Sequence, residues 1–339
     1  MRDARDGSQT MSSELPDDPA LPGLRKIRTG GLAQVMSEPE LELAALWMHN
    51  YVPGSRATLE ARVADRRFAI KIYADDPSDE AEVYRRLAVL GLAGDFGPRV
   101  PRLLSWDRDQ KILVLSWLEG PSASQLVKDG KGRRAGELAV AWLRAASGGD
   151  IRFGPPRGCG HLMYQAGASV GALTAADPLL GATAKRTAKV LVRTQPGEGT
   201  PHLVNSTLYA RHILDMGDGP GVIDWQQFGQ GPLEVDAGMF LATISRAALR
   251  HQEVADEATR AREAFLEGTR GLVDPNSLEW YWAASLLHLA ASGLKTGLRT
   301  QPTLGAHSLV REAAWRAEHQ VAPPLLEGGA QGDLPRDHP

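Results

Sequence analysis

The sequence predicts an α+β fold of two lobes, with a small antiparallel sheet followed by a larger helical lobe. Two observations carry this prediction: strand patterns come early in the chain, and helical patterns fill most of the rest. The length of 339 residues also suits two lobes, since about 150 residues is typical of one domain. We expect the first lobe to span 23–117 and the second 118–322, between a disordered leader (1–22) and a disordered tail (323–339).

The first lobe is expected to hold two strand pairs around one helix. LEARVADRRFAIKIY (59–73) has the alternation of two strands joined by a short turn. A helix over 78–91 follows, with a serine at its start, two acids in its first turn and a glycine at its end. After a bend rich in glycine and proline, a turn at 106–110 leads into the strand KILVLSWL (111–118).

The second lobe is expected to be mostly helical, with one interruption of β character. ARHIL (210–214) and GVIDW (221–225) flank the turn DMGDGP, which is a hairpin signal. The helical periodicity predicts six helices, over 135–147, 176–194, 233–250, 253–269, 277–294 and 304–320.

Composition excludes several classes of protein. The net charge of -3 argues against a nucleic-acid protein that relies on basicity. The single cysteine, Cys159, cannot form an internal disulfide or a cysteine-rich zinc module. The longest nearly apolar stretch, 281–294, is too short to span a bilayer, and the first residues lack the apolar core of a signal peptide. We therefore expect a cytoplasmic protein without membrane or nucleic-acid partners.

Two common phosphate-binding patterns, GxxxxGK[ST] and GxGxxG after a strand, do not occur. One hydrolase pattern does occur, because residues 167–171 fit G-x-S-x-G with Ser169 at the nucleophile position. That motif needs a buried strand before the serine, and HLMYQA is a poor strand. The alternative is a segment of small residues in a packed helix or a loop.

Lys71 and Glu80 are the first candidate site residues. Lys71 lies in FAIKIY on the strand face opposite Phe68, Ile70 and Ile72, where it is either a solvated side chain or a cation that holds phosphates. Glu80 lies on the apolar stripe of the following helix, and a carboxylate on a packed face needs a partner. We therefore predict a Lys71–Glu80 pair, although Glu80 could instead complement the helix dipole.

Asp224 is the second candidate, since it follows the apolar run Gly-Val-Ile at the end of the predicted hairpin. The opposite strand carries His212, so the hairpin could present both side chains to a metal ion. The alternative is an aspartate that only caps the chain reversal after it.

These features together resemble the aminoglycoside phosphotransferase and choline kinase family, relatives of the protein kinases, over residues 40–320. The resemblance implies a protein-kinase-like fold and a kinase that uses ATP and Mg²⁺ to phosphorylate a small molecule. It implies that Lys71 binds the phosphates and Glu80 orients it. It also implies that the backbone around Ser116 and Leu118 holds the adenine.

The resemblance places the catalytic loop at VNSTLYARHIL (204–214) and the metal-binding aspartate at Asp224 in VIDW. It further implies that Asp236 braces the loop. The family pattern is His-Gly-Asp, four residues, then Asn. Here Thr207 stands where the family has its base, and His212 stands where it has the second metal ligand.

These departures leave two functions open. A hydroxyl cannot take a proton as the family's aspartate does, and Mg²⁺ prefers oxygen ligands to the nitrogen of His212. A positioned base contributes about 10²–10⁴ in rate, so its loss slows transfer without abolishing it. The chain is expected to be either a small-molecule kinase with an altered catalytic loop or a kinase-like pseudoenzyme that binds a nucleotide or small ligand with little transfer.

Overall fold

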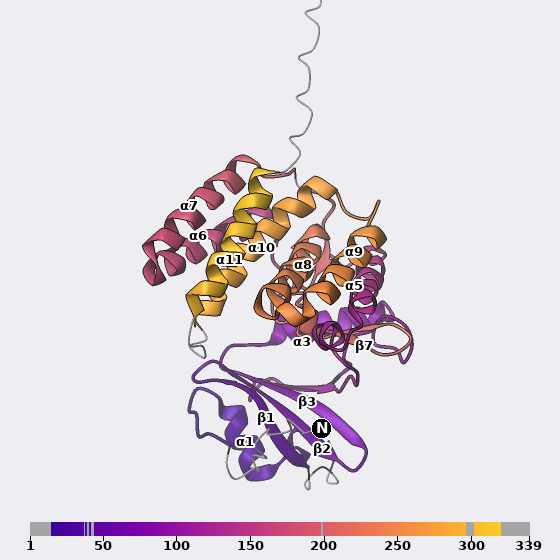
Figure 1. Cartoon of the computed structure of the whole chain (residues 1–339). Helices are drawn as coiled ribbons and strands as arrows, with labels where there is room; N and C mark the ends of the chain where they lie inside the picture. The colour runs from indigo at the N-terminus through magenta and orange to yellow at the C-terminus, as the bar shows by residue number, and fades with distance from the viewer. Residues whose placement is uncertain are drawn as a thin grey trace, which may run out of the picture.

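The computed structural model describes residues 15–36, 38, 41, 44–197, 199–295 and 302–319. An antiparallel sheet of five strands forms the lower part of the molecule in Figure 1. Its strand order is β1-β2-β3-β5-β4, so β3, which carries Lys71, lies at its centre. The strands are β1 (Ala45–Val52), β2 (Arg56–Val63), β3 (Arg66–Tyr73), β4 (Leu103–Asp107) and β5 (Ile112–Ser116). The two predicted strand pairs are therefore confirmed, and β1 is an addition to them.

A separate apolar core covers one face of this sheet. Phe68, Ile70 and Ile72 of β3 pack there against α1 (Pro22–Gly30) and α2 (Ala33–Met36), as the alternation in FAIKIY predicts. Leu15 and Leu21 are buried in the same core, so packed structure begins earlier than residue 23. The rest of the expected leader (1–14) and the expected tail (323–339) lie outside the described residues.

The large lobe consists of packed helices above the sheet (Figure 1). All six predicted helices are present, as α5, α7, α8, α9, α10 and α11. The sequence did not single out α6 or the short α4. The bounds are α4 (Ala123–Lys128), α5 (Gly132–Ser147), α6 (Cys159–Ala176), α7 (Pro178–Arg193), α8 (Glu234–Arg250), α9 (Ala255–Gly268), α10 (Pro275–Lys295) and α11 (Pro302–Glu318), with 3₁₀ turns η3 (Ala210–His212) and η4 (Gln252–Val254).

The predicted hairpin is present but shorter than expected. β7 (Ile213–Asp215) pairs with β8 (Pro220–Val222), and residues 210–212 form the turn η3 instead of continuing the strand. A second short pair joins β6 (His202–Val204) to β9 (Gly229–Gly231). These two pairs bracket residues 205–212 and 223–228, the segments that carry the candidate site.

The hydrolase alternative at Ser169 is wrong. Ser169 lies inside helix α6, which begins ten residues before it at Cys159, so no strand leads into the serine. Its hydroxyl donates to the backbone oxygen of Gln165 one turn earlier, and its side chain is buried. The small residues of this segment belong to a packed helix, which was one of the two alternatives to a nucleophile.

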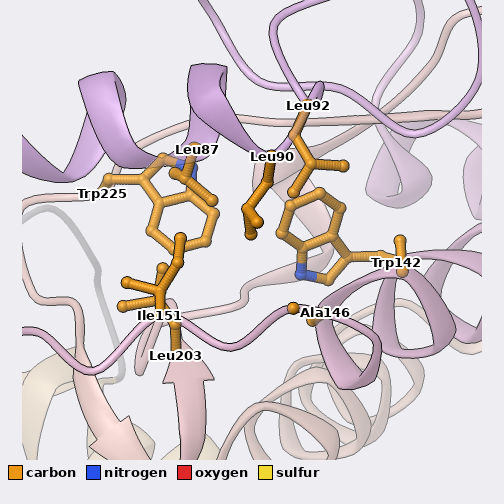
Figure 2. A pocket seen from close by; sticks show the side chains of 10 residues that line it. Leu87, Leu90, Leu92, Trp142, Ala146, Ile151, Leu203 and Trp225 are labelled. Carbon is orange, nitrogen blue, oxygen red and sulfur yellow. The ribbon is translucent and has the colours of Figure 1, made fainter.

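An apolar contact joins α3 (Ser78–Val89), which carries Glu80, to the helical lobe (Figure 2). Leu87 of α3 points toward Trp225, and the Trp142 and Trp225 rings meet edge to face with centroids 5.7 Å apart. The cavity between the two rings is about 10 Å³, too small for anything larger than a water molecule, so this is a packing contact.

No helix in the described part of the chain is long and apolar enough to cross a bilayer.

Candidate active site

Lys71 is the centre of the candidate site. Its Nζ donates to Oε1 of Glu80 at 2.5 Å and to Oδ1 of Asp224 at 3.0 Å. Lys71 comes from β3, Glu80 from the first turn of α3, and Asp224 from the segment just after β8. The predicted Lys71–Glu80 pair is therefore present, and Asp224, 153 residues away in the chain, completes it.

The electrostatics of this group keep the charges fixed at neutral pH. Burial lowers the pKa of Lys71, but Glu80 together with Tyr73, Tyr84 and Asp224 outweighs burial and holds that pKa well above its usual range. Burial raises the pKa of Asp224, but Lys71 and His212 reverse the effect and lower that pKa to about 2. Lys71 is thus a cation and Asp224 an anion throughout the physiological range.

His212 is neutral and has a defined tautomer. Burial lowers its pKa to about 4, although Asp224 acts in the opposite direction. Because Nδ1 lies 3.0 Å from the backbone oxygen of Thr207, Nδ1 carries the hydrogen and donates it. Nε2 therefore has a free lone pair, 3.5 Å from Oδ2 of Asp224. A cation placed between His212 Nε2 and the Asp224 carboxylate would be bound by both groups.

Asp236 holds the start of the loop over 204–214, which the resemblance predicts to be catalytic. Its buried carboxylate accepts the backbone N–H groups of Asn205 at 2.8 Å and Ser206 at 2.7 Å. Ser206 has φ 67°, in the left-handed region that favours glycine. Asp224 has a left-handed backbone too, with φ 63°. The backbone at both residues therefore needs support from hydrogen bonds.

Asn205 supplies such support, and it also fixes Thr207. The Asn205 amide donates to the backbone oxygen of Asp224 at 3.0 Å, and its Oδ1 accepts from the Thr207 hydroxyl at 3.2 Å. The Thr207 hydroxyl is thus turned toward Asn205. Thr207 is not among the residues that line the cleft described below, whereas His212 and Asp224 are.

A cleft of about 650 Å³ lies between the sheet and the helical lobe. Lys71, His212 and Asp224 line it, and so does the connection after β5, where the chain passes from the sheet to α4. Ser116, the last residue of β5, and Leu118, in this connection, both line the cleft. The residues predicted as phosphate and adenine contacts therefore share one cavity, while Glu80 lies behind Lys71.

Several residues of the site could not be identified from the sequence. Arg56 and Arg211 line the cleft, and Trp117 lines it beside His49, with ring centroids 5.7 Å apart. A turn of Pro-Gly-Ser directly before Arg56 is the one local signal for that residue. The resemblance places Asn205 at the histidine of the His-Gly-Asp pattern, but its contact with a segment 19 residues away had no signal in the sequence.

Asp224 and His212 can supply only a few of the ligands that a divalent cation needs. Substrate phosphates and water would have to supply the rest. No cluster of three or more His, Cys, Asp or Glu side chains suited to a metal occurs in the described residues. Asp224 offers carboxylate oxygens, and Mg²⁺ commonly binds to one or two carboxylates together with substrate phosphates and water. The Nε2 of His212 fits ions such as Mn²⁺ better than Mg²⁺, since imidazole is a softer ligand than oxygen.

The chain belongs to the phosphotransferase enzyme family. It matches that family over residues 54–275, which is more than half of its length. The match includes Lys71, Glu80, the loop around Thr207, Asp224 and Asp236. No match is found among curated proteins.

Solved structures of low sequence identity share the fold, which is two-lobed and protein-kinase-like. A variant of aminoglycoside phosphotransferase APH(4)-Ia in complex with AMP-PNP and hygromycin B is 14% identical, with a TM-score of 0.55, and the match covers 83% of this chain and 97% of that one. A choline/ethanolamine kinase family protein from Mesorhizobium loti is 16% identical, with a TM-score of 0.54 and coverages of 86% and 93%. Spectinomycin phosphotransferase APH(9)-Ia with ADP and spectinomycin is 13% identical, with a TM-score of 0.51 and coverages of 81% and 92%.

The contacts of Asp236 predict the effect of replacing it. Asp236→Asn keeps one acceptor oxygen but directs an amide N–H at one of the two backbone donors, so one donor loses its partner. We expect a loss of about 1–3 kcal/mol in the free energy of unfolding, measured by urea denaturation. Glu234→Gln, two residues earlier on α8, keeps its acceptor for the backbone N–H of Asp274 and is the control. Equal stability of both variants would contradict a bracing role for Asp236.

Proposed function

We propose that this protein is a kinase that transfers a phosphoryl group from ATP to a hydroxyl of a small molecule. The observation that supports this most is the placement of Lys71, which bridges Glu80 and Asp224 at the edge of a cleft large enough for a nucleotide. Membership of the phosphotransferase enzyme family supports the same reaction class. Two of the solved structures named above contain ADP or AMP-PNP.

In this proposal each residue acts on charge or position. Lys71 holds the nucleotide phosphates, and Glu80 keeps Lys71 oriented and charged. Asp224, with His212, binds the divalent cation, which when bound neutralises negative charge on the phosphates. Ser116 and Leu118 line the adenine end. Transfer passes through a loose transition state in which positioning and charge neutralisation supply most of the catalysis, so the reaction does not depend on a strong base.

The alternative is a pseudoenzyme that binds nucleotide in the same cleft with little transfer. Thr207 favours it, because its hydroxyl donates to Asn205 and cannot accept a substrate proton. A missing base corresponds to a factor of about 10²–10⁴, or about 3–5.5 kcal/mol. The two functions share every nucleotide contact and differ only in turnover.

The role of Lys71 can be separated from its effect on folding. Lys71→Met alone would leave Glu80 buried without its cation, which costs about 3–5 kcal/mol. We therefore compare Lys71→Met/Glu80→Gln with Glu80→Gln by isothermal titration of ATP. Loss of the Lys71 ammonium should weaken ATP binding by well over tenfold relative to Glu80→Gln, because a charge-assisted contact to phosphate is lost. Equal affinity in the two proteins would exclude Lys71 as a nucleotide contact.

Asp224 should make nucleotide binding depend on a divalent cation. Adding Mg²⁺ to the EDTA-treated protein should raise ATP affinity in the wild type and not in Asp224→Asn, as measured by isothermal titration. Mn²⁺ should raise it more than Mg²⁺, because His212 offers a nitrogen ligand. If ATP binds equally well in EDTA, the cation has no part in binding and the pseudoenzyme alternative gains support.

The catalytic loop provides a direct test of turnover. We expect basal ATP hydrolysis near the detection limit in the wild type and a rise of at least several-fold in Thr207→Asp/His212→Asn, which supplies both the base and the oxygen ligand. Water replaces the acceptor in this assay. Thr207→Asn/His212→Asn, similar in shape but without a base, is the matched control and should stay at the wild-type rate. A fast wild type that Thr207→Asp slows would show that this protein uses another base.

A further inference from the structure

Two cations in the cleft lack the carboxylate partners that the others have. Lys71 pairs with Glu80 and Asp224, and Arg67 pairs with Glu119. Arg56 and Arg211 line the same cleft, and neither makes an ion pair within the described part of the chain. The two carboxylates that line the cleft, Glu119 and Asp224, are both already engaged.

Arg56 reaches from the sheet to the helical lobe. It is the first residue of β2, directly after the turn between β1 and β2. Its Nη1 donates to the side-chain oxygen of Gln226 at 2.5 Å, across 170 residues of sequence. A guanidinium has five N–H donors, and this contact with a neutral amide uses one of them without balancing the charge.

Arg211 lies on the opposite side of the cleft, on η3 beside His212. Its guanidinium carbon is 4.2 Å from the centroid of the Tyr209 ring. Stacking on a ring face holds the guanidinium in a fixed plane and leaves the N–H groups at its edge available. Asp224 acts on the charge of this guanidinium from a distance, but no carboxylate in the described part of the chain lies within ion-pair distance of it.

The cleft thus has unbalanced positive charge near Asp224. A carboxylate at residue 207 would offset part of it, but the loop has the neutral Thr207 there. The lining includes four cations and two carboxylates, so positive charge is in excess, and a concave site with such an excess concentrates anions. Arginine is also suited to planar or tetrahedral oxyanions, since two parallel N–H groups match two oxygens.

We propose that Arg56 and Arg211 form an oxyanion-binding site at the phosphate end of the cleft, distinct from the Lys71–Asp224 pair. Its ligand is a phosphate, sulfate or carboxylate group. Such a group has two sources: the terminal phosphate of a nucleotide, or an anionic substituent on the acceptor. The second source rests on the proposed function and would make the acceptor an anion, the opposite of a polycationic antibiotic.

The test uses inorganic sulfate as the probe, titrated by calorimetry at constant ionic strength. We expect sulfate to bind the wild type, with the dissociation constant raised at least tenfold in Arg56→Gln and in Arg211→Gln. Arg193→Gln removes an exposed arginine at the end of α7 that does not line the cleft, and it should leave sulfate affinity unchanged. Absence of sulfate binding, or equal affinity in all four proteins, would overturn the proposal.

A repeat with saturating AMP-PNP separates the two sources. Sulfate that is displaced by AMP-PNP identifies the site as that of the terminal phosphate, and sulfate that still binds identifies it as a site for an anionic acceptor. Titration of AMP-PNP alone tests the proposed function independently. If AMP-PNP fails to bind while sulfate binding depends on both arginines, the kinase proposal fails and the oxyanion site stands. If AMP-PNP binds and sulfate does not, the reverse holds.

Discussion

The buried contact of Lys71 with Glu80 and Asp224 is the constraint on which the rest of this site depends. A buried ammonium is costly unless carboxylates surround it, and here one carboxylate comes from α3 and the other from the segment after β8. The sheet, α3 and the hairpin therefore have to meet at one point for all three charges to be satisfied. A displacement of the sheet or of α3 would leave a buried charge without its partner, and a displacement of the hairpin would remove the second carboxylate from Lys71.

Apolar packing holds the same elements in the same arrangement. Trp225, the residue after Asp224, contacts Leu87 one to two turns after Glu80 on α3 (Figure 2). The indole nitrogen of Trp225 donates to the backbone of Val222 in β8, which fixes the ring to the hairpin. Because one segment supplies both the ion pair and this packing, the orientation of Asp224 is coupled to the position of α3. Its left-handed backbone, with φ 63°, is sustained by these contacts.

The sequence predicted those parts of the structure that depend on local periodicity. Alternation in FAIKIY separates Lys71 from the apolar face, and the helical stripe places Glu80 on a packed edge, so their pairing follows from two short segments. The contacts of Arg56 with Gln226 and of Asn205 with Asp224 have no such signal, since they join segments far apart in the chain. The burial of Leu15 and Leu21 was missed for the related reason that a short segment packed on a sheet has no periodicity of its own.

The orientation of Thr207 shows why a loop cannot be interpreted residue by residue. Substitution of the base by a threonine suggests a hydroxyl facing the acceptor, yet that hydroxyl bonds to Asn205, which itself holds the backbone of Asp224. Thr207 and Asn205 thus act together to support the geometry of the metal-side aspartate. In the proposed reaction, where charge neutralisation supplies most of the catalysis, a loop that holds Asp224 in place and brings Arg211 to the cleft keeps that contribution without a base at residue 207. Such a loop suits the binding and orientation of phosphate groups under either of the two proposed functions.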